Sequence, residues 1–200
     1  GLYCMITGNH DCKRTSFNLC EEDRKLGFAF LLTMPGAPFI YYGDEIGMAY
    51  RWLPTKEGGY HRTGSRTPMQ WDNGENAGFT TGTPWYTVNP NYTDVNVEAQ
   101  ENDPNSQLNF YRKAIALRKE YADASIHGQF ILHLKGHRQL FVYDKIGEDG
   151  TKLTVVINLS EKTLSSKKAL KYVCPMAKEI LSNYDGEVGA KLRPYEARVY

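Results

Sequence analysis

The 200-residue chain has no long hydrophobic run, no excess of one charge and few cysteines. No apolar stretch approaches the roughly 20 residues that a membrane-spanning helix needs, so no membrane partner is expected. Lysine and arginine (24) nearly balance aspartate and glutamate (23), and the two signs are interspersed. A nucleic-acid partner is therefore not expected either, because it would need a basic stripe or patch. These absences leave the composition of an ordinary globular protein.

The cysteines lack the spacing of a metal site or of a disulfide-rich scaffold. No C-x-x-C pair is present, so the cysteine spacing matches no zinc pattern. An even count permits disulfides, but the cysteine density is low for a secreted scaffold. We therefore favour reduced thiols and a cytoplasmic protein. Cys4 lies in an apolar segment and is predicted to be a small core residue. The four positions are Cys4, Cys12, Cys20 and Cys174.

The first 42 residues have the pattern of a strand, a helix and a second strand. The apolar run 2–6 leads directly into Asn, His and Asp at positions 9–11. Acids at 21–23 suit the positive end of a helix dipole, and Pro and Gly at 34–36 end that helix. The continuous apolar run 39–42 favours a strand buried on both faces. In a barrel of parallel strands, polar residues at the C-terminal strand ends carry the chemistry.

Residues 47–105 show no periodicity and are predicted to form one long functional loop. The segment is too aromatic for a disordered linker, so it should fold back on the protein with short helical turns. Stacking on a ligand is one use of such rings, but packing of the loop is the expected role of most of them. The aromatic residues are Trp52, Tyr60, Trp71, Phe79, Trp85 and Tyr86.

The remainder of the chain is predicted to be one helix followed by an antiparallel β-sandwich. Asp103 and Pro104 resemble an N-cap and a first helical position, and cations at 118–119 suit the last turn. After Tyr121 the apolar pattern changes to period two, and residues 148–150 suit a hairpin turn. The predicted strands lie at 129–132, 140–143, 153–157, 180–181 and 197–200.

With these motifs in view, the chain resembles the C-terminal part of an alpha-amylase-family (glycoside hydrolase family 13) enzyme. Within that family it is most similar to bacterial alpha-glucosidases and oligo-1,6-glucosidases. The Asn-His-Asp triplet alone would be a weak signal, but the motifs occur together and in the family's order. The resemblance rests on residues 8–11 with Arg14, residues 36–48, residues 65–71 and residues 109–118.

The resemblance implies a fold class of α/β plus all-β. Residues 1–123 would be the last βαβα portion of a catalytic (β/α)8 TIM barrel, including the long loop at about 47–105. Residues 124–200 would be a C-terminal β-sandwich domain. The chain also begins without Met, at an apolar strand, and we interpret it as the C-terminal piece of a larger enzyme. Its barrel elements would be the seventh strand (1–7), the eighth strand (39–42) and the closing helix (103–121).

The resemblance also implies residue roles. Asp11 would be the catalytic transition-state stabiliser, hydrogen-bonded to sugar hydroxyls. His10 and Arg66 would bind substrate. The nucleophile and the acid/base would lie on earlier strands outside this chain, so the chain alone is predicted to be inactive. The expected partners are an oligosaccharide or alpha-glucoside substrate and the missing N-terminal part of the barrel. No cofactor is expected, and no metal is expected because the family's calcium sites lie largely outside this segment.

Several side chains near this motif have simpler explanations. Asp11 alone would most often be a local cap in a turn. Asn9 is expected to shape that turn, and Arg14 to brace a loop. Asp44 and Glu45 look catalytic because they are adjacent acids after a strand. We predict instead that they are structural and ion-paired beneath the site. No role is expected for His61, His127, His133 or His137.

Three alternatives to a hydrolase remain open. Trehalose synthases, sucrose isomerases and related transglycosylases share the scaffold and differ in whether water or a sugar hydroxyl attacks the intermediate. Heavy chains of amino-acid transporters resemble the family without catalysis, and the pairing of His10 with Asp11 argues against them. A carbohydrate-binding module is disfavoured because the predicted strands carry no row of exposed aromatic residues.

Overall fold

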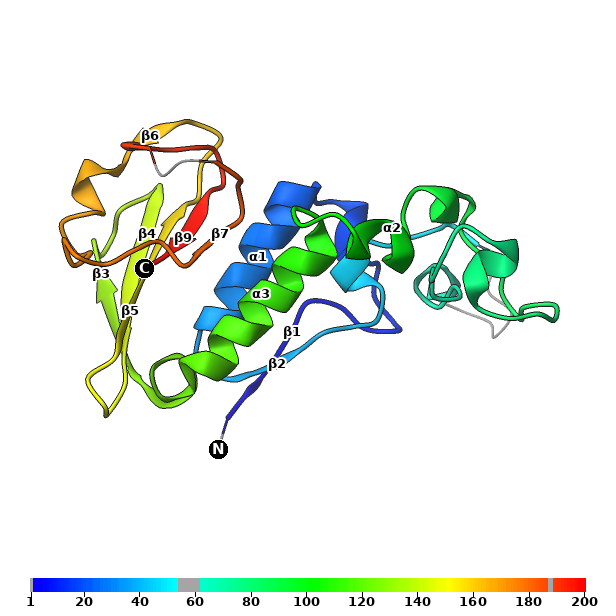
Figure 1. Ribbon diagram of the computed structural model, residues 1–200, viewed down its shortest axis with the longest axis horizontal. Helices are drawn as coiled ribbons and strands as arrows, with labels where there is room; N and C mark the ends of the chain where they lie inside the picture. Colours follow the sequence, from blue (N-terminus) through cyan, green and yellow to red (C-terminus); the bar gives the residue numbers. More distant parts are fainter. Residues whose placement is uncertain (1, 54–61, 187–188) are drawn as a thin grey trace. The chain divides into compact units, whose positions relative to one another are not determined.

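The computed structural model describes residues 2–53, 62–186 and 189–200 (Figure 1). The chain divides into two compact units, which we call the sheet unit and the loop unit. Two helices, α1 (Glu21–Thr33) and α3 (Gln107–Glu120), contribute residues to both. The sheet unit comprises Gly1–Tyr3, Lys25–Ala37 and Lys113–Tyr200, and the loop unit comprises Cys4–Arg24 and Pro38–Arg112.

The two strands predicted near the N-terminus are present and form a two-stranded sheet. They are β1 (Cys4–Ile6) and β2 (Ala37–Phe39). The second strand was predicted at 39–42, which is wrong by two to three residues. The N–H of Asp44 donates to the carbonyl of Tyr41 (3.1 Å). The turn includes the aromatic residues Tyr41 and Tyr42, so the extended chain ends at Phe39.

The prediction that these strands are buried is wrong for the described residues. Leu2, Tyr3 and Ile6 are 54%, 59% and 56% exposed, and Cys4 is exposed rather than in a core. Within the part of the chain that the structure describes, β1 pairs with a single neighbouring strand. Its apolar side chains therefore face solvent, although their pattern is that of an interior strand. The other three cysteines are also exposed and free.

Helix α1 begins and ends where the sequence predicts. Glu21, Glu22 and Asp23 lie in its first turn, and Gly36 adopts φ 126° beyond its end. Arg118, which lies in the last turn of α3 as predicted, satisfies the carbonyl groups at this end. Arg118 is buried, and its guanidinium donates to the carbonyls of Leu32, Met34 and Gly36 (2.5, 3.3 and 2.7 Å).

Helix α3 begins at Gln107, so the predicted start at Asp103 and Pro104 is wrong. Asp103 accepts a hydrogen bond from the N–H of Asn105 (2.9 Å), which closes a turn before the helix. Ser106 takes the capping position instead, because its Oγ accepts from the N–H of Asn109 (3.2 Å).

The loop unit is built from short helical turns, as predicted. Its small core contains Ile46, Met48, Met69 and Leu108. The turns are the 3-10 helices η1 (Thr15–Phe17), η2 (Asp44–Ile46), η3 (Thr63–Ser65), η4 (Glu75–Gly78) and η5 (Pro90–Thr93), with the short helix α2 (Val97–Glu101).

The sheet unit holds a five-stranded antiparallel sheet in the order β3-β4-β5-β9-β7 (Figure 1). A second, two-stranded sheet pairs β6 with β8 and was not predicted. A π-helical segment, η6 (Asp123–His127), lies at the expected boundary. The division into 1–123 and 124–200 stays a prediction. The strands are β3 (Gln129–His133), β4 (Leu140–Ile146), β5 (Lys152–Asn158), β6 (Leu164–Ser165), β7 (Leu181–Ser182), β8 (Lys191–Leu192) and β9 (Ala197–Val199); the 3-10 turn η7 (Ser166–Lys168) follows β6.

Period-two alternation on β4 separates the two faces of the large sheet. Val142 belongs to a core on one face with Val156 and with Leu192 from the small sheet. Phe141 and Tyr143 meet α1 on the other face. The rings of Phe30 and Phe141 are 5.9 Å apart, and the hydroxyls of Thr33 and Tyr143 share a hydrogen bond. Both faces of the sheet are therefore covered within this unit.

Arg118→Met should lower the free energy of unfolding by about 2–4 kcal/mol, because it leaves buried carbonyl groups without donors. Urea unfolding of the purified chain measures this change. Arg112→Met is the matched control on the same helix. Its ion pair with Glu101 (2.8 Å) is half exposed, and its loss should cost no more than about 1 kcal/mol. Equal losses for the two variants would contradict the proposed role of Arg118.

Candidate functional site

The polar triplet after β1 forms a cluster with the loop that carries Arg66. The side chain of Asn9 accepts from the N–H of Asp11 (2.8 Å) and shapes the turn, as predicted. Oδ1 of Asp11 accepts from Arg66 (3.0 Å) and from Arg62 (3.2 Å), and Oδ2 lies 3.3 Å from Nε2 of His10. Arg66 also donates through Nε to the carbonyl of His10 (3.0 Å). The three predicted site residues therefore lie together.

The charge of Asp11 is set by these neighbours. The hydrogen bond from Arg62, followed by the imidazole of His10 and the guanidinium of Arg66, holds the pKa of Asp11 below its usual value. The side chain is half exposed. Asp11 is therefore an ionised carboxylate that can only accept hydrogen bonds, and part of it is open to a ligand.

Sequence reasoning missed Arg62. It reaches Asp11 because the turn η3 brings positions 62 and 66 to the same side of the loop. The only signal in the sequence is the spacing of two arginines four residues apart, and such pairs are frequent on solvated surfaces. The contact between Arg62 and Asp11 requires the chain to fold back over some 50 residues, and no local sequence pattern predicts this.

A buried arginine attaches this loop to the strand ends. Arg14 is 2% exposed and donates to the carbonyls of Tyr42 (2.5 Å) and Ser65 (3.0 Å). The predicted role of Arg14 as a brace is therefore confirmed. Two constraints require glycine at position 43: the small space beside Arg14 and a φ of 84°. A Cβ there would lie 2.4 Å from Sδ of Met48 and 2.9 Å from Arg14.

The observed partners of Asp44 differ from the predicted ion pair. The Asp44 carboxylate is 1% exposed and accepts from the hydroxyl groups of Thr7 (3.1 Å) and Thr15 (3.4 Å). Burial raises the pKa of Asp44 and of Glu45, and the attraction of Arg14 only partly offsets it. This arrangement supports a structural role, as predicted, with hydroxyl groups in place of a close cation.

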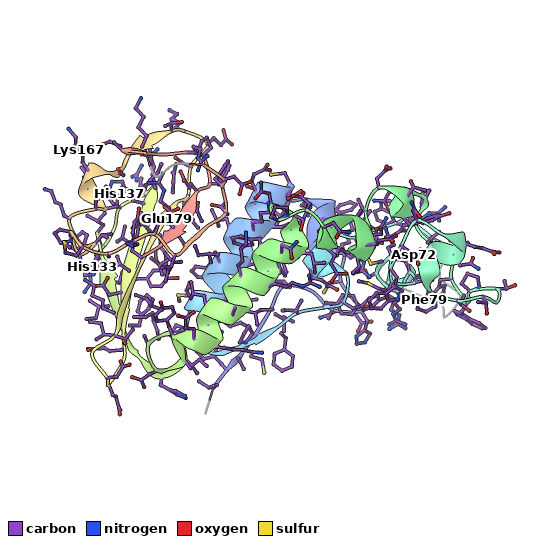
Figure 2. All side chains as sticks on the ribbon, viewed as in Figure 1. Asp72, Phe79, His133, His137, Lys167 and Glu179 are labelled. Carbon is purple, nitrogen blue, oxygen red and sulfur yellow. The ribbon has the colours of Figure 1, made fainter. Side chains whose placement is uncertain are left out.

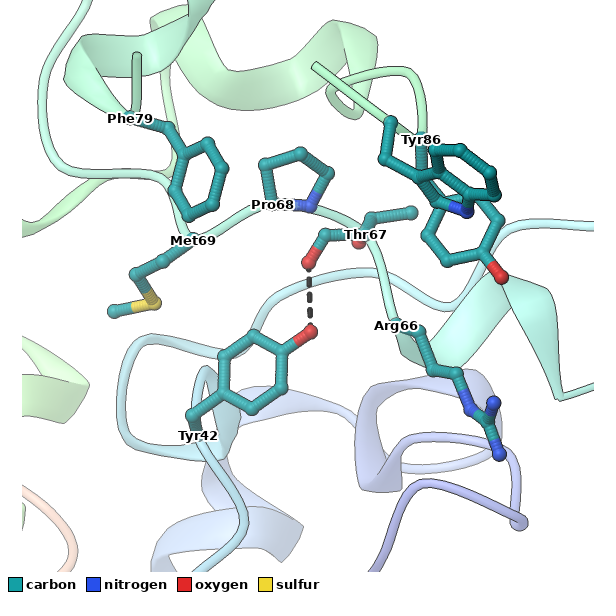
Figure 3. Close-up of a pocket in the computed structure, with 8 residues that line it drawn as sticks. Tyr42, Arg66, Thr67, Pro68, Met69, Phe79 and Tyr86 are labelled. Carbon is teal, nitrogen blue, oxygen red and sulfur yellow. Dashed lines mark hydrogen bonds between the residues drawn. The ribbon is translucent and has the colours of Figure 1, made fainter.

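A pocket of about 280 Å³ adjoins the cluster, and we call it the aromatic pocket. Phe79 and Tyr86 stand on opposite sides of Pro68 in Figure 3, and Tyr42 and Arg66 complete the lining below them in that view. The hydroxyl of Tyr42 donates to the carbonyl of Thr67 (2.8 Å) and fixes one wall. The lining is Tyr42, Arg66, Thr67, Pro68, Met69, Phe79, Trp85 and Tyr86.

Phe79 is carried by a closed turn that spans residues 71–78 (Figure 2 labels Asp72 and Phe79). The N–H groups of Trp71 (2.9 Å) and Asp72 (3.3 Å) both donate to the carbonyl of Ala77. Asn76 and Ala77 adopt positive φ values of 52° and 56°, which non-glycine residues seldom do. The turn therefore maintains a strained backbone in order to close on itself.

Four of the loop aromatics keep about half of their surface or more exposed, although the rings of Trp52 and Trp85 also contact neighbouring rings. Trp52, Trp71, Phe79 and Trp85 are 55%, 50%, 48% and 72% exposed. Trp52 contributes to a cluster in which its ring is 4.6 Å from Nζ of Lys13, whereas Trp85 lines the aromatic pocket. Tyr60 and His61, which the sequence singled out, lie outside the described residues.

The described residues contain no group of three or more His, Cys, Asp and Glu side chains arranged to hold a metal ion. Across the same residues, no helix is long and apolar enough to cross a membrane. His133 belongs to the sheet unit (Figure 2), where its Nε2 lies 2.8 Å from Asp144 and its ring stacks on Tyr172.

The cluster and the pocket together are typical of a small-molecule site, with apolar walls and a few convergent polar groups. Comparison with known proteins gives the family. The alpha-amylase catalytic domain matches residues 2–128, and the chain belongs to this family. It is an alpha-glucosidase-like relative within glycoside hydrolase family 13, as the sequence motifs predicted.

The relatives are longer glycoside hydrolases. An oligo-1,6-glucosidase of Parageobacillus thermoglucosidasius is 38% identical over all of this chain, which covers 42% of that enzyme. The probable oligo-1,6-glucosidase 2 of Bacillus subtilis (strain 168) is 39% identical, with the same coverage. An alpha-glucosidase of Candida albicans is 37% identical over 84% of the chain and 35% of that enzyme. The chain thus spans about two fifths of the length of relatives that match it throughout.

Solved structures match the whole chain as well. The trehalulose synthase MutB, as a variant in complex with Tris, aligns with a TM-score of 0.81 at 27% identity. A trehalose-6-phosphate hydrolase variant of Bacillus licheniformis aligns with a TM-score of 0.79 at 28% identity. In both cases the alignment covers all of this chain and 43% of the other. The fold of the chain is therefore that of a segment of these enzymes.

Asp44→Asn should stabilise the chain more at pH 7 than at pH 3.5, relative to the unmodified chain. Because burial raises the native pKa of Asp44, its contribution to stability is fully present below the unfolded-state pKa of about 3.9 and is lost as pH rises through the native value. The asparagine amide does not titrate. Removing the charge of Asp44 also removes its repulsion of the Glu45 carboxylate. Urea unfolding at the two pH values measures the difference.

Asp149→Asn is the contrasting control for this measurement. Hydrogen bonds from Thr151 lower the pKa of Asp149, so its contribution is present above the unfolded-state pKa and is lost on acidification. The asparagine variant should therefore lose relative stability at pH 7. The same pH trend in both variants would be inconsistent with a pKa of Asp44 that is raised by burial.

Proposed function

We propose that this chain is the C-terminal portion of a retaining glycoside hydrolase that cleaves alpha-glucosidic bonds in oligosaccharides. In this proposal Asp11 supplies transition-state stabilisation, and His10 and Arg66 bind the substrate. The observation that carries it is the position of an ionised, half-exposed carboxylate just after β1, within hydrogen-bond distance of Arg66 and Arg62.

The chemistry follows from the state of Asp11. As a retaining glycosidase passes through an oxocarbenium-like transition state, hydrogen bonds to sugar hydroxyls strengthen. A carboxylate kept ionised by two arginines is a strong acceptor for those hydroxyls. The arginines occupy Oδ1 and fix the orientation of the group, so Oδ2 is the oxygen directed to the sugar, beside His10.

The same proposal assigns the rest of the reaction to polypeptide outside this chain. Retaining enzymes need two carboxyl groups about 5–5.5 Å apart. Asp44 does not suit this role because it is 1% exposed and its carboxylate is engaged by the hydroxyl groups of Thr7 and Thr15. We therefore place the nucleophile and the acid/base in the part of the relatives that this chain does not match.

The exposed strand β1 supports an incomplete barrel. The side chains of Leu2, Tyr3 and Ile6 have the apolar character of interior residues and are more than half exposed. In the proposal, β1 and β2 are the last two strands of a (β/α)8 barrel, α3 closes it, and residues 124–200 form the β-sandwich domain. The N-terminal part of the barrel covers β1. The cytoplasmic location expected from the cysteines stays a prediction.

A second candidate is a transglycosylase or isomerase built on the same scaffold. It is favoured by the similarity to the trehalulose synthase MutB along the whole chain. Asp11 would have the same role in both reactions, because they share the glycosyl intermediate and differ in the acceptor. The transporter heavy chain is the less favoured alternative. A protein without catalysis has no need for an oriented, ionised carboxylate at a strand end.

The purified 200-residue chain should not hydrolyse isomaltose or p-nitrophenyl alpha-glucoside above the blank rate. It lacks the proposed nucleophile and proton donor, and substrate-positioning groups alone cannot replace a covalent nucleophile. Release of glucose and of p-nitrophenol measures the activity. Turnover that disappears in Asp11→Ala would place the complete site inside this chain and contradict the proposal.

In the longer polypeptide, Asp11→Asn should lower kcat by about a hundredfold or more and change KM much less. The asparagine keeps the shape but removes the charge that accepts the strengthened hydrogen bonds. Steady-state kinetics with isomaltose measure both constants. Asp149→Asn, in the sheet unit, is the control and should behave as the unmodified enzyme. A normal kcat for the Asp11→Asn variant would show that Asp11 does not take part in the reaction.

A further inference from the structure

A lysine two residues after Asp11 has its ammonium group among three aromatic rings. Nζ of Lys13 lies 3.9 Å from the ring centroid of Phe17, 4.6 Å from that of Trp52 and 5.9 Å from that of Tyr50. All three distances are within the roughly 6 Å at which a cation is attracted to the face of a ring. We call the side chains of Phe17, Tyr50 and Trp52 the aromatic cage.

The rings of the aromatic cage also contact one another edge to face. The interplanar angles are 88° for Phe17 with Tyr50, 87° for Tyr50 with Trp52 and 78° for Phe17 with Trp52. Rings at right angles to one another turn several faces toward a common point, and each face carries partial negative charge. The aromatic cage is therefore a cation site, and the side chain that fills it belongs to the same chain.

The aromatic cage joins two segments that are distant in sequence. Phe17 is the last residue of η1, and the other two rings belong to residues 50–52 at the start of the long loop. A second contact between these segments is the hydrogen bond that Oγ of Ser16 donates to the carbonyl of Met48 (2.5 Å). The cation of Lys13 thus holds the start of the loop against η1.

Residues 50–52 in turn support the turn that carries the arginine donors of Asp11. The N–H of Arg51 donates to the carbonyl of Gly64 (3.3 Å), which lies in η3. The two segments approach so closely that a Cβ at position 64 would collide with the carbonyl of Arg51. The two arginines that flank η3 both donate to Oδ1 of Asp11. A displacement of residues 50–52 is therefore passed on to these donors.

We propose that Lys13 is a positioning residue whose cation, held in the aromatic cage, keeps η3 where its flanking arginines reach Asp11. This role rests on the proposed function, because Lys13 acts through the same carboxylate. The charge is essential, since an uncharged side chain of the same length is not attracted to the ring faces. Arg14 holds the loop independently at the carbonyl of Ser65. Loss of the charge at position 13 should therefore displace the donors without unfolding the loop.

NMR of the 200-residue chain tests the aromatic cage directly. Protons above the face of an aromatic ring are shielded, so the ε-CH2 protons of Lys13 should resonate upfield of those of Lys119, an exposed lysine near the end of α3. Trp52→Leu should return them toward the position of Lys119. Trp71→Leu is the matched control, because it removes an exposed loop tryptophan that is not one of the three rings. Equal shifts for Lys13 and Lys119 in the unmodified chain would overturn the proposal.

The pKa of Asp11, measured in the same chain through its carboxyl carbon signal, tests the coupling. The hydrogen bond from Arg62 is the main reason why this pKa lies below its usual value. Lys13→Met removes the cation and should raise the pKa of Asp11 toward the ordinary value of about 3.9, whereas Lys13→Arg should leave it low. Trp52→Leu keeps the charge of Lys13 and should cause the same rise as Lys13→Met. A rise in Lys13→Met alone would indicate a direct effect of charge and would overturn the positioning role, as would an unchanged pKa in both variants.

In the longer polypeptide, Lys13→Met should lower kcat about three- to tenfold, as expected for the loss of a few exposed cation–π contacts, and Lys13→Arg should restore it. Circular dichroism establishes that each variant is folded. A normal kcat for Asp11→Asn would contradict the proposed function, whereas the NMR results would still establish the coupling of Lys13 to Asp11. A large loss of kcat in Asp11→Asn with a normal kcat in Lys13→Met would overturn only the role of Lys13.

Discussion

The candidate site depends on one buried guanidinium, that of Arg14. Its hydrogen bonds to the carbonyls of Tyr42 and Ser65 attach the loop after β2 to the strand ends, and its cation lies over the rings of Tyr41 and Tyr42. A buried charge is costly unless it is well paired, and here carbonyl groups and aromatic faces provide the compensation. The loop that supplies the two arginines of the Asp11 cluster is thereby held in place.

The electrostatics of the loop unit separate two kinds of carboxylate. Asp11 is half exposed and held ionised by arginine donors, whereas Asp44 is buried among hydroxyl groups and its protonated form is favoured. The difference comes from the environment, because the two side chains are chemically identical. Asp11 is kept charged at the surface, whereas Asp44 is shielded from water.

Much of the fold follows from the sequence, and the departures have identifiable physical causes. Helix α1 was predictable because its first-turn acids and terminal glycine are local signals. The start of α3 was not, because Asp103 closes a turn and leaves the cap to Ser106. His10, Asp11 and Arg66 could be named from motifs. Arg62 and the pocket face of Trp85 depend on contacts between distant segments, and the exposure of β1 depends on what covers it, so no local pattern predicts them.

The closed turn at residues 71–78 has a consequence for how the pocket wall is built. Two of its hydrogen bonds run from the N–H groups of Trp71 and Asp72 to the carbonyl of Ala77. The backbone holds two residues in the left-handed region to make this closure. The turn is also attached to its neighbours, because the side chain of Asn76 donates to the carbonyls of Thr80 and Gly82 (both 3.1 Å) and the N–H of Glu98 donates to the carbonyl of Trp71 (3.0 Å). A substitution that disturbs either neighbouring segment would therefore be transmitted through the turn to the wall at Phe79.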